Sequence, residues 1–432
     1  MSDFDLLVRS EQDIGISEGK FVVLGKNLSG SAREEIDATK FALFSGVIDA
    51  HVHFNEPGRT EWEGFATGSR AAAAGGTTTV CEMPLNAQPP TIDGWSFDLK
   101  RSAAETDSFV DFALWGGMIP GNVDQFETLR DRGVIGLKAF MCDSGIDDFP
   151  AVDEHELRAG MQRATELKLI VAVHAESQQI TQQLRQERIA ADKTSVRDFL
   201  ESRPVKAELE AIRQALDLAG ETGCRLHIVH VSCGRGIEII AEARAQGVDV
   251  SCETCPHYLL LTDEDMERLG AVAKCAPPLR APDDQKDLRS WLSEVTTIGS
   301  DHSPSPWSMK ERANFFEVWG GISSCQHLLS LLHEASIPPA EIERLTSKTV
   351  AQRFGLTQKG GIEIGKDADF TLVDLNSEET VTAEKLYYRH RHTPYLGRKL
   401  RSRIVHTVLR GQTVFRDGKV PSKPCGEFVR PS

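Results

Sequence analysis

Six residues of this sequence are of types that bind divalent metal ions, and each of them ends or follows a short apolar run. They are His51, His53, Lys138, His174, His230 and Asp301. His51 and His53 stand two positions apart in the run GVIDAHVH, and alternate residues of a β-strand point to the same side. We therefore expect these two imidazoles to chelate one ion together, and the four histidines and the carboxylate to converge on one metal centre.

Lys138 needs a separate explanation, because it lies within the apolar run VIGLKAF, where a buried ammonium group is costly and repels cations. The lysine either pairs with an acidic side chain or is chemically modified. Addition of carbon dioxide to the neutral amine would give a carbamate (N6-carboxylysine), whose two oxygens can bridge two metal ions. The charge balance favours this carbamate. Two dications outweigh Asp301, a carbamate and a bridging hydroxide by about one positive charge, which suits the polarisation of a carbonyl group.

Eight apolar runs, each followed by an amphipathic stretch, predict the elements that position these residues. The runs are residues 46–53, 77–83, 109–118, 133–140, 167–176, 224–232, 248–254 and 295–303. Nearly continuous apolar runs are typical of parallel strands buried on both faces. Eight alternations of strand and helix predict an α/β fold, a (β/α)₈ TIM barrel over residues 46–355, with the functional site at the carboxyl ends of its strands.

The two ends of the chain follow a different pattern. Residues 1–45 and 356–432 carry short alternating strands separated by turn residues, which predicts one small β domain built from both termini. Residues 180–210 read as a polar helical insertion between the fifth and sixth strands of the barrel.

Composition restricts the partners that the chain can bind. The 432 residues carry 49 Lys and Arg against 64 Asp and Glu, a net charge of −15, so the average surface field repels nucleic acid. The basic stretch 388–403 favours a solvated or subunit-interface face over an anion-binding patch. No apolar run is long enough to span a membrane, and MSDFDLLVRS is unlike a signal peptide. With 9 scattered cysteines, these features predict a cytoplasmic protein.

Six motifs resemble, in order and over nearly the whole chain, those of the cyclic amidohydrolases. They are HVHFNEPGR (51–59), GLKAF (136–140), VHAE (173–176), HVS (230–232), ETCPHYL (253–259) and GSDHSP (299–304). The resemblance implies a (β/α)₈ barrel with a small β-sandwich domain, a homotetramer, and two divalent ions per subunit. Zinc is the usual metal, with manganese, cobalt or nickel as the other options.

The same resemblance implies a role for each ligand. His51, His53 and Asp301 would hold the more buried ion, and His174 and His230 the other. Lys138, carboxylated by carbon dioxide, would bridge the two ions.

Within this family the chain is most similar to the allantoinases, through MPLNAQPPT (83–91), KCAPPLR (274–280), WGGI (319–322) and YRHRHTPYLGR (388–398). Dihydroorotases typically have an arginine where this chain has Asn55, and an amide suits a neutral ureide better than a carboxylate. Hydantoinases and dihydropyrimidinases usually have a tyrosine shortly after the bridging lysine, and AFMCDSG has none. These activities stay open as alternatives, as does a catalytically dead scaffold, although all six ligand positions are filled.

The reaction implied by the resemblance is hydrolysis of the hydantoin ring of allantoin to allantoate, a step of purine catabolism and nitrogen salvage. A hydroxide bridging the two ions would attack the ring carbonyl. Asp301 would accept the hydroxide proton and deliver it to the departing ring nitrogen. For the ureide groups we expect hydrogen bonds from Asn86, Ser303 and the backbone at Ala276.

Overall fold

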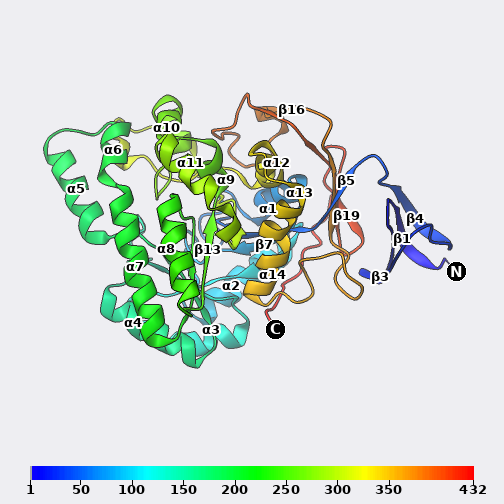
Figure 1. The fold of residues 1–432 in the computed structure, drawn as a ribbon, viewed down its shortest axis with the longest axis horizontal. Helices are drawn as coiled ribbons and strands as arrows, with labels where there is room; N and C mark the ends of the chain where they lie inside the picture. The colour runs from blue at the N-terminus through cyan, green and yellow to red at the C-terminus, as the bar shows by residue number, and fades with distance from the viewer. Residues whose placement is uncertain (1) are drawn as a thin grey trace.

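The computed structural model describes residues 2–432, and its central part alternates strands with helices (Figure 1). The central strands are β6 (Val47–Val52), β7 (Thr77–Glu82), β8 (Asp111–Leu114), β9 (Gly116–Gly117), β10 (Leu137–Phe140), β11 (Ile170–His174), β12 (Arg225–Ile228), β13 (Val250–Thr254) and β14 (Thr297–Ile298). Each of the eight predicted runs contains at least one of these strands.

Parallel pairing joins these strands in sequence order, as β6-β7-β8 and then β9 through β14. Only Trp115 separates β8 from β9. Its backbone N–H donates to the carbonyl of Glu82 (3.0 Å), while that of Gly116 donates to Gly136 (2.9 Å), so one continuous segment pairs with strands on both sides. A parallel bridge between Val52 and His302 connects the first strand to the segment after the last.

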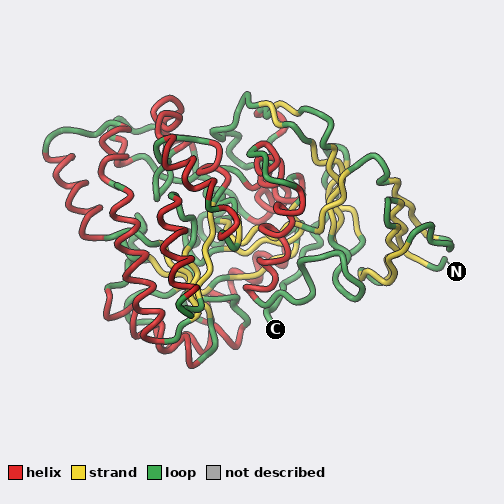
Figure 2. Tube along the Cα trace, in the orientation of Figure 1, coloured by secondary structure: helices red, strands yellow, loops and turns green. Residues whose placement is uncertain are grey.

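Helices cover the central strands, which Figure 2 shows as yellow strands largely surrounded by red helices. The helices are α1 (Phe65–Ala74), α2 (Gly94–Asp107), α3 (Phe126–Arg132), α4 (Glu154–Glu166), α5 (Gln178–Ala190), α6 (Val196–Ser202), α7 (Val205–Thr222), α8 (Gly234–Ala245), α9 (Pro256–Leu260), α10 (Asp263–Leu269), α11 (Pro282–Ser290), α12 (Leu328–Glu334), α13 (Pro339–Glu343) and α14 (Thr349–Phe354). Burial on both faces explains why β6, β7 and β13 consist only of buried residues.

Local signals in the sequence determine where several of these helices begin and end. Asp153 caps α4 by accepting a hydrogen bond from the backbone N–H of Glu156 at 2.8 Å, and the Glu156 side chain accepts one in return. Helices α3 and α7 end at Gly133 and Gly223, whose φ angles of 98° and 69° lie in the left-handed region that glycine adopts without strain.

Two four-stranded sheets lie at one end of the molecule, at the right of Figure 1. The first has the order β3 (Lys20–Gly25), β2 (Asp13–Ser17), β1 (Phe4–Arg9), β4 (Ala32–Asp37). The second has the order β19 (Gln412–Arg416), β18 (Arg403–Leu409), β15 (Phe370–Asp374), β5 (Ala42–Ser45). Since β5 pairs with β15, and one apolar cluster contains both Phe21 and Phe370, the two termini share strands and a core.

Residues 376–432 do not all join these sheets. The short strands β16 (Glu379–Thr380) and β17 (Lys399–Leu400) pair with each other, and between them Arg389 and His392 make hydrogen bonds to the backbone carbonyls of Glu63 and Ser305. Part of the basic stretch 388–403 is therefore engaged within the protein. The last residues return to β8, where Phe428 bridges Phe112.

Among residues 2–432, no helix is both long and apolar enough to cross a membrane.

Candidate metal centre

The first group of predicted ligands converges at the end of the first central strand. His51 is in β6, His53 is the next residue but one, and Asp301 follows β14. The Oδ1 atom of Asp301 lies 3.2 Å from His51 Nε2 and 3.4 Å from His53 Nε2. Two nitrogens and one oxygen thus face one point, as the His-x-His spacing predicts.

The second group comes from the neighbouring strands β10, β11 and β12. His174 ends β11, and its Nδ1 atom lies 3.1 Å from Nε2 of His230, which is two residues beyond β12. Lys138 is in β10 and has no exposed surface. The rings of His51 and His230 have centroids 5.5 Å apart, so the two groups are neighbours.

The donor atoms present fit divalent metal ions. Atoms that share a tetrahedral ion at about 2.1 Å lie about 3.4 Å from one another, close to the separations of Asp301 from the two histidines and of His174 from His230. Among residues 2–432, no atom accepts a hydrogen bond from Lys138 Nζ. A buried polar atom is rarely left in this state, so a further group is expected beside Lys138.

The protonation states also suit a metal site. Burial lowers the pKa of Lys138 to about 7 and the pKa of His230 well below its usual value, so the imidazole is neutral. Burial alone would raise the pKa of Asp301, but its interactions with His51, His53 and His230 outweigh burial and hold the pKa below the usual range. Asp301 is therefore a carboxylate at neutral pH.

Two buried carboxylates orient two of the candidate ligand histidines. Glu253 Oε1 accepts a hydrogen bond from His51 Nδ1 at 2.7 Å, which leaves His51 Nε2 free to face Asp301. Glu176 Oε2 accepts from His174 Nε2 at 2.8 Å and also pairs with Arg203. Partners of this kind fix the tautomer and the ring orientation of a metal-ligating histidine.

The backbone is strained at two of the six positions. His230 has φ of 39° and Asp301 has φ of 46°, in the left-handed region that non-glycine residues rarely adopt. Such strain is frequent at functional sites, because the surrounding fold must hold the side chain in place.

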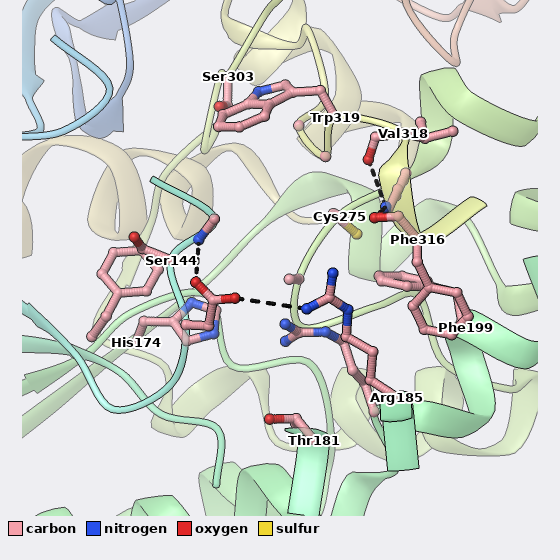
Figure 3. Close-up of a pocket in the computed structure, with 18 of the residues that line it drawn as sticks. Ser144, His174, Thr181, Arg185, Phe199, Cys275, Ser303, Phe316, Val318 and Trp319 are labelled. Carbon is pink, nitrogen blue, oxygen red and sulfur yellow. Dashed lines mark hydrogen bonds and ion pairs between the residues drawn. The ribbon is translucent and has the colours of Figure 1, made fainter. Parts of the chain in front are cut away.

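A cavity of about 660 Å³ opens onto the cluster, and Figure 3 shows part of its wall. Five predicted ligands line it, as do Asn86, Ala276 and Ser303. The amide of Asn86 lies 3.4 Å from Ser303 Oγ. Lys138 lies beneath the wall, with Nζ 4.9 Å from the centre of the Phe140 ring.

The interpretation of Asn55 as a substrate contact was wrong. Asn55 is fully buried, does not line the cavity, and donates from Nδ2 to the carbonyl of Pro304 at 3.3 Å. Its φ of 66° is in the left-handed region, which asparagine tolerates better than most residues. The residue thus has a local structural role.

Sequence reasoning missed several residues of the site. Helices α5 and α6, read only as a polar insertion, supply part of the cavity wall. Lys274 is 5% exposed, and its Nζ atom donates to the carbonyls of Phe315 and Val318 at 2.6 Å. These bonds hold the loop of residues 316–321, which forms another part of the cavity wall. The signals available were the position of α5 directly after VHAE and the neighbourhood of Lys274 in KCAPPLR.

Comparison with known proteins assigns this fold and site to a class. The chain belongs to the amidohydrolase family, whose family model matches residues 42–414, so the resemblance to these hydrolases is confirmed. An allantoinase from Rubrobacter xylanophilus is 54% identical, over 100% of this chain and 98% of that protein. An allantoinase from Solibacter usitatus is 49% identical, over 97% of this chain and 93% of that protein.

Solved structures show the same fold. An L-hydantoinase (dihydropyrimidinase) from Arthrobacter aurescens matches with a TM-score of 0.96 at 32% identity, over 99% of this chain and 100% of that one. A dihydropyrimidinase from Brevibacillus agri matches with a TM-score of 0.91 at 28% identity, over 100% of this chain and 99% of that one.

Proposed function

We propose that this protein is an allantoinase, which hydrolyses the hydantoin ring amide of allantoin to give allantoate. The observation that carries the proposal is the convergence of His51, His53 and Asp301 beside His174 and His230, in a chain 54% identical over its full length to an allantoinase. The reaction belongs to purine catabolism and nitrogen salvage.

The chain's own residues divide the work between holding two divalent ions and moving a proton. His51, His53 and Asp301 would hold one ion, His174 and His230 the other, and Lys138, carboxylated by carbon dioxide, would lie between them. When bound, the ions supply Lewis acidity that polarises the ring carbonyl and lowers the pKa of water. Asp301, which is ionised at neutral pH, accepts a proton from the attacking water and returns it to the departing ring nitrogen.

The cavity wall next to the ligands supports the proposed substrate contacts. Asn86 offers an amide and Ser303 a hydroxyl, so both can donate to and accept from the N–H and C=O groups of a cyclic ureide. The backbone at Ala276 would provide the third contact. None of these groups is charged, which suits a neutral ring.

The finer structural expectations are part of the same proposal. The central strands would close as a (β/α)₈ barrel over residues 46–355, and the two terminal sheets would form a β-sandwich from residues 1–45 and 356–432. The parallel bridge between Val52 and His302 supports closure, and the shared terminal core supports the sandwich. We further propose zinc as the usual metal, a homotetramer, and a cytoplasmic location, for which the nine unpaired cysteines are support.

Hydantoinase or dihydropyrimidinase activity is the second candidate, favoured by the TM-score of 0.96 to an L-hydantoinase. Against it, no tyrosine lines the cavity within residues 2–432.

A substrate panel tests the proposal. The purified protein, loaded with zinc or manganese in the presence of bicarbonate, is offered allantoin, hydantoin, dihydrouracil and dihydroorotate. We expect allantoin to have the highest kcat/KM. Faster opening of another ring would contradict allantoin as the substrate but would still support a cyclic amide hydrolase. Loss of metal on dialysis together with no turnover would favour the catalytically dead scaffold.

A further inference from the structure

One face of α5 forms a continuous wall of the cavity. The residues that line it are Gln178, Thr181, Gln182, Arg185, Gln186 and Ile189. Their spacing of three and four residues is that of a single helical face. Five of the six side chains are polar, and three of them are amides.

The fold places this face next to the ligand cluster. Helix α5 begins four residues after His174, which ends β11. Gln178 Oε1 accepts a hydrogen bond from the backbone N–H of Asp143 at 2.7 Å, which ties the helix to the loop after β10. Figure 3 shows Arg185 extending into the space between His174 and Phe199.

Gln178 and Thr181 are hydrogen-bonded, whereas the side chains further along this face keep unused hydrogen-bonding groups. Gln178 Nε2 donates to Gln182 Oε1 at 3.4 Å, which directs the other amide atom, Gln182 Nε2, to a different partner. Within residues 2–432, neither Gln182 Nε2, nor the Arg185 guanidinium, nor the Gln186 side chain donates a hydrogen bond. Arg185 has a 4.0 Å ion pair with Asp143. On another face of the helix, by contrast, Gln183 donates to Glu187 at 2.8 Å.

We propose that Gln182, Arg185 and Gln186 form a subsite that binds a ureido substituent on the ring of the substrate. The inference rests on the proposed function, since allantoin is a hydantoin ring that carries one ureido group. The ureido carbonyl accepts from the guanidinium and the amide N–H groups, and its N–H groups donate to amide oxygens and to Asp143.

This subsite would determine specificity against hydantoins that carry an apolar substituent. A hydrocarbon group in the same place would displace water from Gln182 and Arg185 without replacing its hydrogen bonds, and such a mismatch discriminates strongly between substrates. The candidate metal ligands act on the hydantoin ring, which all these substrates share. Helix α5 would therefore discriminate between substrates by the group attached to that ring.

The test compares Gln182→Leu and Arg185→Met with Gln183→Leu, a control with the same chemical change one residue along. Allantoin and 5-methylhydantoin are assayed with each metal-loaded protein, and metal content and circular dichroism are recorded. Both target side chains are exposed, so the variants are expected to fold. We expect the ratio of kcat/KM for allantoin to that for 5-methylhydantoin to fall about 5- to 30-fold in each target variant, mainly through KM, and to stay constant in the control.

The outcomes separate the two proposals. An unchanged ratio in both target variants, or an equal fall for both substrates, overturns the subsite while the wild type still opens allantoin. A wild type that opens 5-methylhydantoin and not allantoin overturns the proposed function and the subsite together. An equal change in Gln183→Leu assigns the effect to the helix as a whole and overturns the subsite.

Discussion

At the scale of single residues, the centre combines groups whose charges depend on burial. Lys138 has no exposed surface and, within the described residues 2–432, no hydrogen-bond acceptor, so the neutral amine is favoured. Asp301 is also deeply placed, yet the three imidazoles around it keep its pKa low. A nucleophilic amine and a carboxylate are therefore available in one place at neutral pH.

Replacing Asp301 with asparagine removes the proton acceptor and keeps the shape. We expect kcat for allantoin to fall by about two to four orders of magnitude, the range that general acid–base catalysis contributes. Steady-state kinetics of the zinc-loaded protein measure the change, and circular dichroism checks the fold. Retention of most of the wild-type rate would exclude the proposed role.

Carboxylation of Lys138 should depend on pH in a defined direction. The reaction of the amine with carbon dioxide forms the N–C bond of the carbamate and releases one proton, and only the neutral amine reacts. Because burial lowers the pKa of Lys138 to about 7, the neutral fraction rises with pH through that value. It is about one tenth at pH 6 and about nine tenths at pH 8.

With ¹³C-bicarbonate and metal-free protein, we expect a carbamate signal by NMR that is strong at pH 8 and weak at pH 6. Lys138→Met, which lacks the amine, is the control and should show no such signal. A signal of equal size at both pH values would contradict the role of the lowered pKa.

At the scale of elements, residues of one central strand hold a candidate ligand on another strand that is far away in the sequence. Glu253 in β13 orients His51 in β6, and Gly299, just after β14, leaves room for both. A Cβ atom at Gly299 would lie 2.7 Å from Glu253 Oε2 and 2.9 Å from the Cβ atom of His51. The Cβ atom of His51 is held by the backbone, and the Glu253 carboxylate is buried and hydrogen-bonded to His51, which limits its movement.

Gly299→Ala should therefore displace His51 and weaken metal binding. We expect a 10- to 100-fold loss of metal affinity, roughly that seen on losing an orienting partner. Metal content after dialysis against graded chelator concentrations provides the measurement. Gly220→Ala in α7, where the nearest atom to an added Cβ lies at 3.8 Å, is the control and should keep its metal. Equal retention in both variants would show that Gly299 is not needed to hold His51.

At the scale of the whole molecule, a buried charge cluster joins the terminal sheets to the central strands. Lys359 Nζ lies 2.5 Å from Asp111 in β8, 2.8 Å from Asp369 and 2.9 Å from Asp367, next to β15. Burial alone would lower the pKa of Lys359, but the three carboxylates raise it. A raised pKa means that the stabilisation is fully present below the ordinary lysine value and is lost only at more alkaline pH.

Lys359→Met leaves the buried carboxylate of Asp369 without its cation, whereas Asp111 keeps its ion pair with Arg410 and Asp367 keeps its ion pair with Lys20. We expect a loss of about 3–5 kcal/mol in stability at pH 7 and a lower Tm. The loss should shrink as pH falls, because protonation removes the unpaired charges. Thermal unfolding at pH 7 and pH 5 measures both effects. Lys366→Met is the control, and its Tm should change little because the ion-pair partner of Lys366, Glu363, is 60% exposed. A similar Tm for both variants would contradict the role of the cluster.

The sequence alone determined the central strands, several helix ends and the residue types of the candidate ligands. Residues such as Val47–Val52 are apolar throughout because a parallel strand is covered on both faces, and a capping residue such as Asp153 acts within one turn of its helix. His51 and His53 could be paired because a strand repeats every two residues. All of these signals are local, so they can be read from neighbouring letters.

Only the tertiary structure decided which distant residues meet. Pairing of β5 with β15, the return of Phe428 to β8, and the hydrogen bond from His51 to Glu253 join positions far apart in the chain. Asn55 likewise faces Pro304 instead of the cavity, while α5 supplies a wall that its polar sequence did not reveal. The physical reason is that these contacts depend on how complete layers pack, and packing has no short-range pattern in the sequence.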